Sequence, residues 1–169
     1  GSGISLPAAC DAPFALLAAQ GGLPDDLRWA RFDLAADAAQ PGVMRAIARG
    51  MATPDAAALG EQYARYIEAP DASATAWLKD ARSRRVAASA LASLARKDPD
   101  AAERLLAQVG PALGFDEGER GRVLYQVALW TVASYLPDSA RRLANVPASA
   151  SDASLHEWRV REAIARRAW

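Results

Sequence analysis

The sequence of 169 residues contains one cysteine, Cys10, and one histidine, His156. These counts exclude a disulfide within the chain and a zinc site built from several Cys and His ligands. β-Branched residues are also scarce, with 8 Val, 4 Ile and 3 Thr against 42 Ala and 18 Leu. Because alanine favours helices and β-branched residues suit pleated sheets, this composition argues against a sizeable β-sheet.

The chain also lacks net charge, since 20 basic residues balance 20 acidic ones. The overall positive field of many nucleic-acid-binding proteins is therefore absent, and no nucleic-acid partner is predicted. No run of 18 apolar, uncharged residues is present, which predicts no transmembrane segment. A basic start followed by an apolar run, typical of a signal peptide, is missing as well.

Proline, glycine and helix-capping residues recur at intervals of about one helix length. Proline suits the first turn of a helix and glycine the residue after its end, so each such position predicts a boundary. With apolar stripes at helical spacing and short connections, this pattern predicts an all-α, solenoid-like superhelical array of helical hairpins. About ten helices are expected, over residues 13–20, 24–39, 41–50, 54–69, 71–79, 83–96, 99–109, 116–135, 138–144 and 152–169.

Residues that could perform catalysis are few. A Ser-His-Asp arrangement needs a histidine as base, and His156 stands beside no nucleophile motif. Glutamates such as Glu61 have an arginine three or four residues away, here Arg65, and ordinary surface ion pairs explain them. The sequence therefore predicts no catalytic residue, no metal site and no cofactor.

The five tryptophans allow two interpretations. Their flat rings could stack on sugars, or they could anchor the packing between hairpins, because aromatic side chains bury large areas. Apolar neighbours favour the packing role for Trp29 and Trp130. Trp77, Trp158 and the nearby Arg161 are retained as candidate glycan contacts.

Five short segments, in a fixed order along the chain, carry a resemblance to a known family. They are residues 7–21, 31–35, 42–43, 87–98 and 158–161. Together they resemble the soluble lytic murein transglycosylases. The resemblance implies a periplasmic enzyme that cleaves the MurNAc–GlcNAc bond of peptidoglycan and leaves a 1,6-anhydro end. It also implies a superhelix of short helices followed by a lysozyme-like catalytic domain.

The resemblance covers the superhelix only, so residues 6–169 are expected to be a fragment of that domain, and residues 1–5 a cloning remnant or linker. The family's catalytic Glu-Ser pair and Gly-Leu-Met-Gln run do not occur in the sequence. The implied partners are glycan strands, bound through the full-length enzyme, and a C-terminal catalytic domain. In the family, the counterpart of Cys10 pairs with an upstream cysteine, which this sequence lacks.

A second hypothesis is an independent helical-repeat adaptor that binds a protein partner and has no connection with the cell wall. Terminal helices with uncapped apolar edges favour the fragment, whereas polar ends favour the adaptor. Both hypotheses share the same fold.

Overall fold

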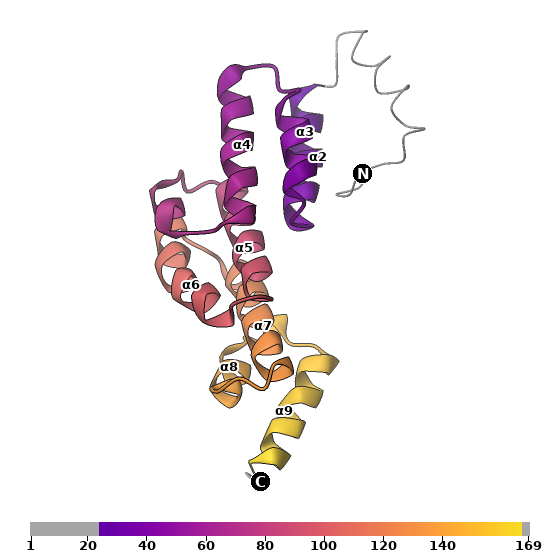
Figure 1. The fold of residues 1–169 in the computed structure, drawn as a ribbon, viewed down its shortest axis with the longest axis vertical. Helices are drawn as coiled ribbons and strands as arrows, with labels where there is room; N and C mark the ends of the chain where they lie inside the picture. The colour runs from indigo at the N-terminus through magenta and orange to yellow at the C-terminus, as the bar shows by residue number, and fades with distance from the viewer. Residues whose placement is uncertain (1–23, 167–169) are drawn as a thin grey trace, which may run out of the picture. The chain divides into compact units, whose positions relative to one another are not determined.

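The computed structural model describes residues 24–166, and this part of the chain is helical throughout, with no strand. It contains eight α-helices and two short 3-10 segments (Figure 1). The predicted all-α fold is confirmed. The helix expected over residues 13–20 and the cysteine Cys10 lie outside the described residues.

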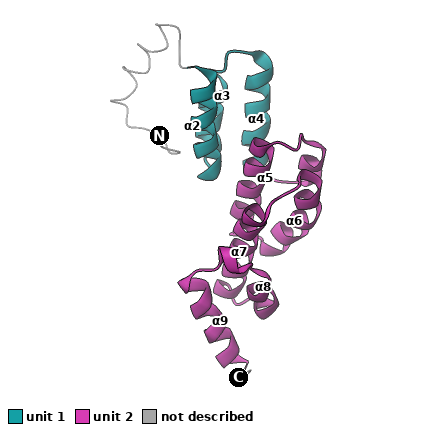
Figure 2. Ribbon diagram, turned by 180° about the vertical axis from the view of Figure 1, so that it is seen from behind, with its two compact units in different colours: residues 1–69 teal, residues 70–169 magenta. Residues whose placement is uncertain are grey.

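The chain divides into two compact units, at residues 1–69 and 70–169 (Figure 2). Each unit consists of consecutive helices joined by short connections. The first contains α2 (Asp25–Asp37), α3 (Pro41–Ala48) and α4 (Pro54–Glu68). The second contains η2 (Ala72–Ala76), α5 (Ala81–Leu94), α6 (Pro99–Leu113), α7 (Glu117–Ala133), α8 (Ser139–Asn145), η3 (Ala148–Ala150) and α9 (Ala153–Ala165).

The first unit packs around Phe32, which is fully buried. Its ring meets Trp29 edge-on, with 5.1 Å between the ring centroids, and lies 6.3 Å from the ring of Tyr63 on α4. Met44 of α3 is fully buried as well. One aromatic side chain on α2 therefore contacts its own helix and α4, and Trp29 has the packing role that its apolar neighbours favoured.

Helices α3 and α4 approach each other closely at Gly60. A Cβ atom at this position would lie 2.7 Å from Cβ of Ala48 and 3.3 Å from the ring of Phe32. The Cβ of Ala48 is fixed to the helix backbone, and the ring of Phe32 is fully buried, so neither can move away freely. The absence of a side chain at Gly60 is what allows the two helices to pack at this distance.

Replacing Gly60 with alanine is therefore expected to lower the free energy of unfolding by about 1–2 kcal/mol, because overpacking outweighs the gain in helix propensity. Gly42→Ala is the matched control: Gly42 is also helical, and a Cβ there meets nothing within 4 Å. This control should be neutral or stabilising by about 0.5–1 kcal/mol. Urea unfolding of both variants makes the comparison, and equal effects would contradict the close-approach argument.

In the second unit α7 is the central element, since α5, α6, α8, η3 and α9 all pack against it. Aspartates begin the helices around it: Asp98 accepts the Ala101 N–H at 2.8 Å, and Asp152 accepts the Leu155 N–H at 2.8 Å. Each side chain satisfies an N–H group that has no partner within the helix. These helix starts follow the predicted pattern.

Two sequence-based boundaries need correction. The helix expected over residues 71–79 is only a 3-10 turn over Ala72–Ala76, because the backbone is extended at Trp77 and the next helix begins at Ala81. The break expected at Gly110, Pro111 and Gly114 is also wrong, since α6 continues through Pro111 to Leu113. Pro111 lies in the last turn, where its ring disrupts one hydrogen bond only. Gly114 ends the helix at φ 72°, a left-handed conformation that suits glycine.

Candidate functional site

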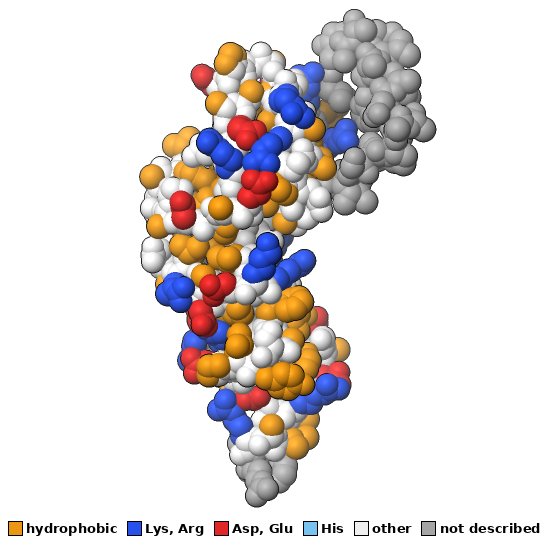
Figure 3. Space-filling view, viewed as in Figure 1, with side chains coloured by type: hydrophobic (Ala, Val, Ile, Leu, Met, Phe, Trp, Pro, Cys, Tyr) orange, Lys and Arg blue, Asp and Glu red, His pale blue; other side chains and the backbone are white. Residues whose placement is uncertain are grey.

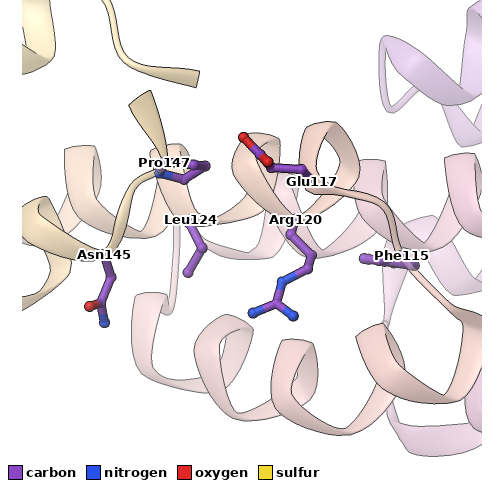
Figure 4. Close-up of a pocket in the computed structure, with 6 residues that line it drawn as sticks. All are labelled: Phe115, Glu117, Arg120, Leu124, Asn145 and Pro147. Atoms are coloured by element: carbon purple, nitrogen blue, oxygen red, sulfur yellow. The ribbon is translucent and has the colours of Figure 1, made fainter. Parts of the chain in front are cut away.

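A pocket of about 470 Å³ opens at the start of α7, and we call it the Arg120 pocket (Figure 4). Its volume lies within the range of small-ligand sites, about 300–1,000 Å³. One wall comes from α7 and from Phe115, which lies two residues before that helix; the other comes from the last residue of α8 and the connection to η3. The lining residues are Phe115, Glu117, Arg120, Leu124, Asn145 and Pro147.

The α7 wall is fixed by a capping box. The carboxylate of Asp116 accepts the Glu119 N–H at 2.7 Å, and the carboxylate of Glu119 accepts the Asp116 N–H at 2.9 Å. This reciprocal pair sets the direction of the first helical turn. Arg120 and Leu124, four residues apart, then fall on one face of the helix.

The opposite wall lies close to α7 because of Gly121. A Cβ at this buried position would lie 2.8 Å from Cβ of Ala150 and 3.2 Å from Cγ of Pro147. A glycine in the second turn of α7 thus lets the segment of Pro147 pack directly on the helix, which brings Pro147 and Asn145 to the pocket.

The acidic side chains at this end of α7 already have partners. The hydroxyl of Ser149 donates to the carboxylate of Glu117. Glu119 accepts from Nε of Arg84 at 3.2 Å, in addition to its role in the capping box. Within the described residues, neither the guanidinium of Arg120 nor the amide of Asn145 makes a hydrogen bond or an ion pair.

The polar groups of the pocket also differ in direction. In Figure 4 the side chains of Arg120, Leu124 and Asn145 extend to the same side of α7, whereas the carboxylate of Glu117 points the other way. A cationic fork and an amide therefore flank an aliphatic side chain. This arrangement suits a small anion that carries an apolar group.

Two of the three predicted glycan contacts lie together on α9. The guanidinium carbon of Arg161 is 5.2 Å from the ring centroid of Trp158, and Arg161 also pairs with Glu157 at 2.5 Å. Trp158 is half-buried and packs against the apolar cluster that contains Leu143 and Leu155. Its ring is therefore partly used for packing, and the Arg161 guanidinium lies over it.

The third predicted contact, Trp77, lies elsewhere. It follows η2, which packs against α6, and its side chain is half-buried. The structure thus pairs Trp158 with Arg161 but does not add Trp77 to them. Trp130 is half-buried too, and its indole N–H donates to Gln126 at 3.0 Å on the same helix.

A second pocket, of about 330 Å³, lies between α8 and α9. Three charged residues line it, Arg159, Glu162 and Arg166. Arg159 holds neighbouring backbone: Nη2 donates to the carbonyl of Leu143 at 2.8 Å and to that of Val146 at 3.2 Å, and Nη1 donates to the hydroxyl of Ser151 at 3.1 Å. These bonds satisfy carbonyl groups at the end of a short helix. The arginine therefore acts as a structural clamp.

The other groups considered for catalysis are separated or exposed. His156 is exposed in the first turn of α9. Among residues 24–166, no group of three or more His, Cys, Asp or Glu side chains has the geometry to hold a metal ion. None of the helices in that range is long and apolar enough to cross a membrane.

The face drawn in Figure 3 shows acidic and basic side chains interspersed with apolar ones. No area of a single sign stands out on it. This agrees with a chain of zero net charge.

An ionic network joins α6 and α8. Arg141 donates to both carboxylate oxygens of Glu103, at 2.7 and 3.0 Å, and Nε of Arg142 donates to the same carboxylate at 2.9 Å. The hydrogen bond from Arg141, together with Arg142, holds the pKa of Glu103 below its usual value of 4.5, against the opposing effect of burial.

This lowered pKa predicts a stability that depends on pH. The network stabilises the fold fully above the unfolded-state pKa of about 4.5, and the contribution is lost as pH falls through the lower folded-state value. We expect the urea midpoint to fall as the pH is lowered below about 4.5, and Glu103→Gln to make that fall shallower. Unfolding curves measured across this range are the test, and an unchanged pH dependence in the variant would contradict it.

The Arg120 pocket was missed by sequence reasoning. The spacing of Glu117, Arg120 and Leu124 on one helix was available as a signal, but such spacing is common on solvated helices. Nothing in the sequence places Asn145 and Pro147 opposite them, because that depends on how α8 and η3 fold back on α7.

Comparison with known proteins gives matches among solved structures. No protein-family model matches the chain, and no curated protein does. An inactive mutant of the lytic transglycosylase Slt from Pseudomonas aeruginosa matches with a TM-score of 0.71 and 27% identity, over 96% of this chain and 27% of that one.

Two further matches show the fold. The 70 kDa soluble lytic transglycosylase from Escherichia coli has a TM-score of 0.65 and 24% identity, over 98% of this chain and 24% of that one. The 70-kDa soluble lytic transglycosylase in complex with bulgecin A has a TM-score of 0.66 and 21% identity, over 98% of this chain and 33% of that one. This chain thus spans a quarter to a third of these proteins. The resemblance to soluble lytic transglycosylases and the fold class are confirmed.

Proposed function

We propose that this chain is a non-catalytic part of the α-superhelical domain of a soluble lytic transglycosylase, and that it holds peptidoglycan for the enzyme. The supporting observation is the match to Slt over 96% of the chain at 27% identity. Because the chain corresponds to 27% of that protein, the activity belongs to the whole enzyme in this proposal.

In the proposed enzyme a catalytic domain cleaves the MurNAc–GlcNAc bond and leaves a 1,6-anhydro end, in the periplasm. The helical segment contributes binding, because interactions with remote parts of a substrate help to orient its reacting centre. In this proposal Trp158 and Arg161 contact a glycan strand, which replaces the cation–π contact between them or the ion pair of Arg161 with Glu157. Trp77 would act as a separate contact.

Peptidoglycan is both a sugar polymer and a peptide carrier, so two kinds of surface are relevant. Exposed aromatic faces stack on sugar rings, and arginine forks pair with the carboxylates of peptides. The second unit carries both kinds, on α9 and at the Arg120 pocket. This is the reason to favour peptidoglycan over an unrelated protein partner.

Cosedimentation with purified, protein-free sacculi tests the proposal. The chain is expected to pellet with the sacculi in a saturable manner at moderate salt, and the sacculi should not be degraded. An unrelated all-helical protein of similar charge is the control. A chain that stays in the supernatant, or one that releases anhydro-muropeptides on its own, would overturn the proposal.

A further inference from the structure

We propose that the Arg120 pocket binds the terminal carboxylate of a short alanyl peptide. This inference rests on the proposed function and deepens it, because it names the peptide part of peptidoglycan as the ligand of this site. Three features of the pocket support it: a guanidinium without a hydrogen-bond partner, an amide on the facing wall, and an aliphatic side chain between them.

The guanidinium of Arg120 is the only charged group of the pocket lining that makes no hydrogen bond or ion pair within the described residues. The other charged group, Glu117, is held by Ser149 and points away. Asp116 and Glu119 are occupied by the capping box. The nearby carboxylates are thus committed elsewhere, and the planar fork of Arg120 is free to take a carboxylate with two parallel bonds.

Asn145 supplies the second polar contact. Its side chain extends to the same side of α7 as that of Arg120 (Figure 4). An amide can donate through nitrogen and accept through oxygen, which matches a peptide group next to a terminal carboxylate. The two residues lie on facing walls, so a peptide end would contact both.

The apolar residues of the lining and the pocket volume limit which ligands fit. In Figure 4 Leu124 lies between the two polar side chains, and Phe115 and Pro147 are the other apolar residues of the pocket lining. A volume of about 470 Å³ accommodates a peptide end with small side chains and not a polymer of several rings. Phe115 is only 9% exposed, so it offers little ring face for stacking on a sugar. The pocket therefore fits a methyl-bearing peptide end better than a pyranose.

The test is a titration of the ¹⁵N-labelled chain with N-acetyl-D-alanyl-D-alanine, followed by amide chemical shifts. Saturable shifts are expected at Arg120, Leu124 and Asn145. Affinity should fall about tenfold for the peptide with a C-terminal amide, and about tenfold for Arg120→Gln, because one charge-assisted pair is lost in each case. No saturable shifts, or equal binding by Arg120→Gln, would overturn the inference.

Arg104→Gln is the matched control, because Arg104 is an exposed arginine on α6 outside the pocket lining. It should bind the free acid as the unchanged chain does, and both variants should keep the helical circular dichroism spectrum. Sacculus binding separates the two proposals. If the chain binds sacculi but not the dipeptide, only the pocket inference fails; if it binds neither, the proposed function fails as well.

Discussion

Phe32→Ala is expected to lower the free energy of unfolding of the first unit by about 4 kcal/mol. Phe32 is fully buried and contacts Trp29 and Tyr63. Its removal takes away the transfer energy of the ring and leaves a cavity between α2 and α4. Urea unfolding followed by tryptophan fluorescence measures this directly, since Trp29 is next to the substituted ring.

Leu27→Ala on the same helix is the control. Leu27 is 53% exposed, so its loss should change the free energy of unfolding by about 0.5 kcal/mol or less. If Phe32→Ala were as mild as Leu27→Ala, the packing described for the first unit would be wrong.

Arg142→Met is expected to cost about 3 kcal/mol in the second unit. The Arg142 side chain is only 6% exposed, and it donates to Glu103 on α6, to Asp100 on α6 and to Thr131 on α7. Methionine fills similar space without a charge, so the loss reports the hydrogen bonds and the ion pairs. The effect stays below the largest known values because Asp100 is 63% exposed and can be hydrated again.

The neighbouring Arg141 is an exposed counterpart with which the buried Arg142 can be compared. It contacts the same carboxylate of Glu103 with two hydrogen bonds but is 47% exposed. Water replaces much of an exposed ion pair, so Arg141→Met should cost about 0.5–1 kcal/mol. Thermal and urea unfolding of the two variants compare their losses in the free energy of unfolding. An equal cost for both would show that burial does not control the strength of this network.

Helix starts were predictable from the sequence because their chemistry is local. Thr53 accepts the Ala56 N–H at 3.2 Å, and Asp98, Asp116 and Asp152 cap the helices that follow them. A side chain three residues before an N–H group can satisfy it whatever the rest of the fold does. Such signals therefore need no tertiary information.

Helix ends were less predictable. A left-handed residue after a helix is usually glycine, and Gly114 follows this rule. Ala39 and Tyr135 adopt the same conformation, at φ 50° and 53°, without being glycine. After α7, for example, the N–H of Leu136 still reaches the carbonyl of Thr131 at 3.0 Å. Backbone hydrogen bonds impose this turn, and composition alone does not reveal it.

One of the two candidate sites was likewise predictable from local sequence, and the other was not. Trp158 and Arg161 are three residues apart on one helix, so their proximity followed from helical spacing. The Arg120 pocket combines residues from two elements about 25 positions apart, and Gly121 sets how closely they pack. A contact that depends on a missing Cβ between two elements has no signature in a single sequence.

Amide hydrogen exchange of the chain, with and without soluble un-cross-linked peptidoglycan chains that carry their peptides, measures whether and where peptidoglycan binds. If this segment holds peptidoglycan, exchange should slow in residues 117–124 and 145–147, which form the pocket, and in the α9 turn around Trp158. Residues of the buried core should exchange at the same rate in both samples. Unchanged exchange along the entire chain, at a concentration of peptidoglycan that saturates a known peptidoglycan-binding protein, would contradict the account.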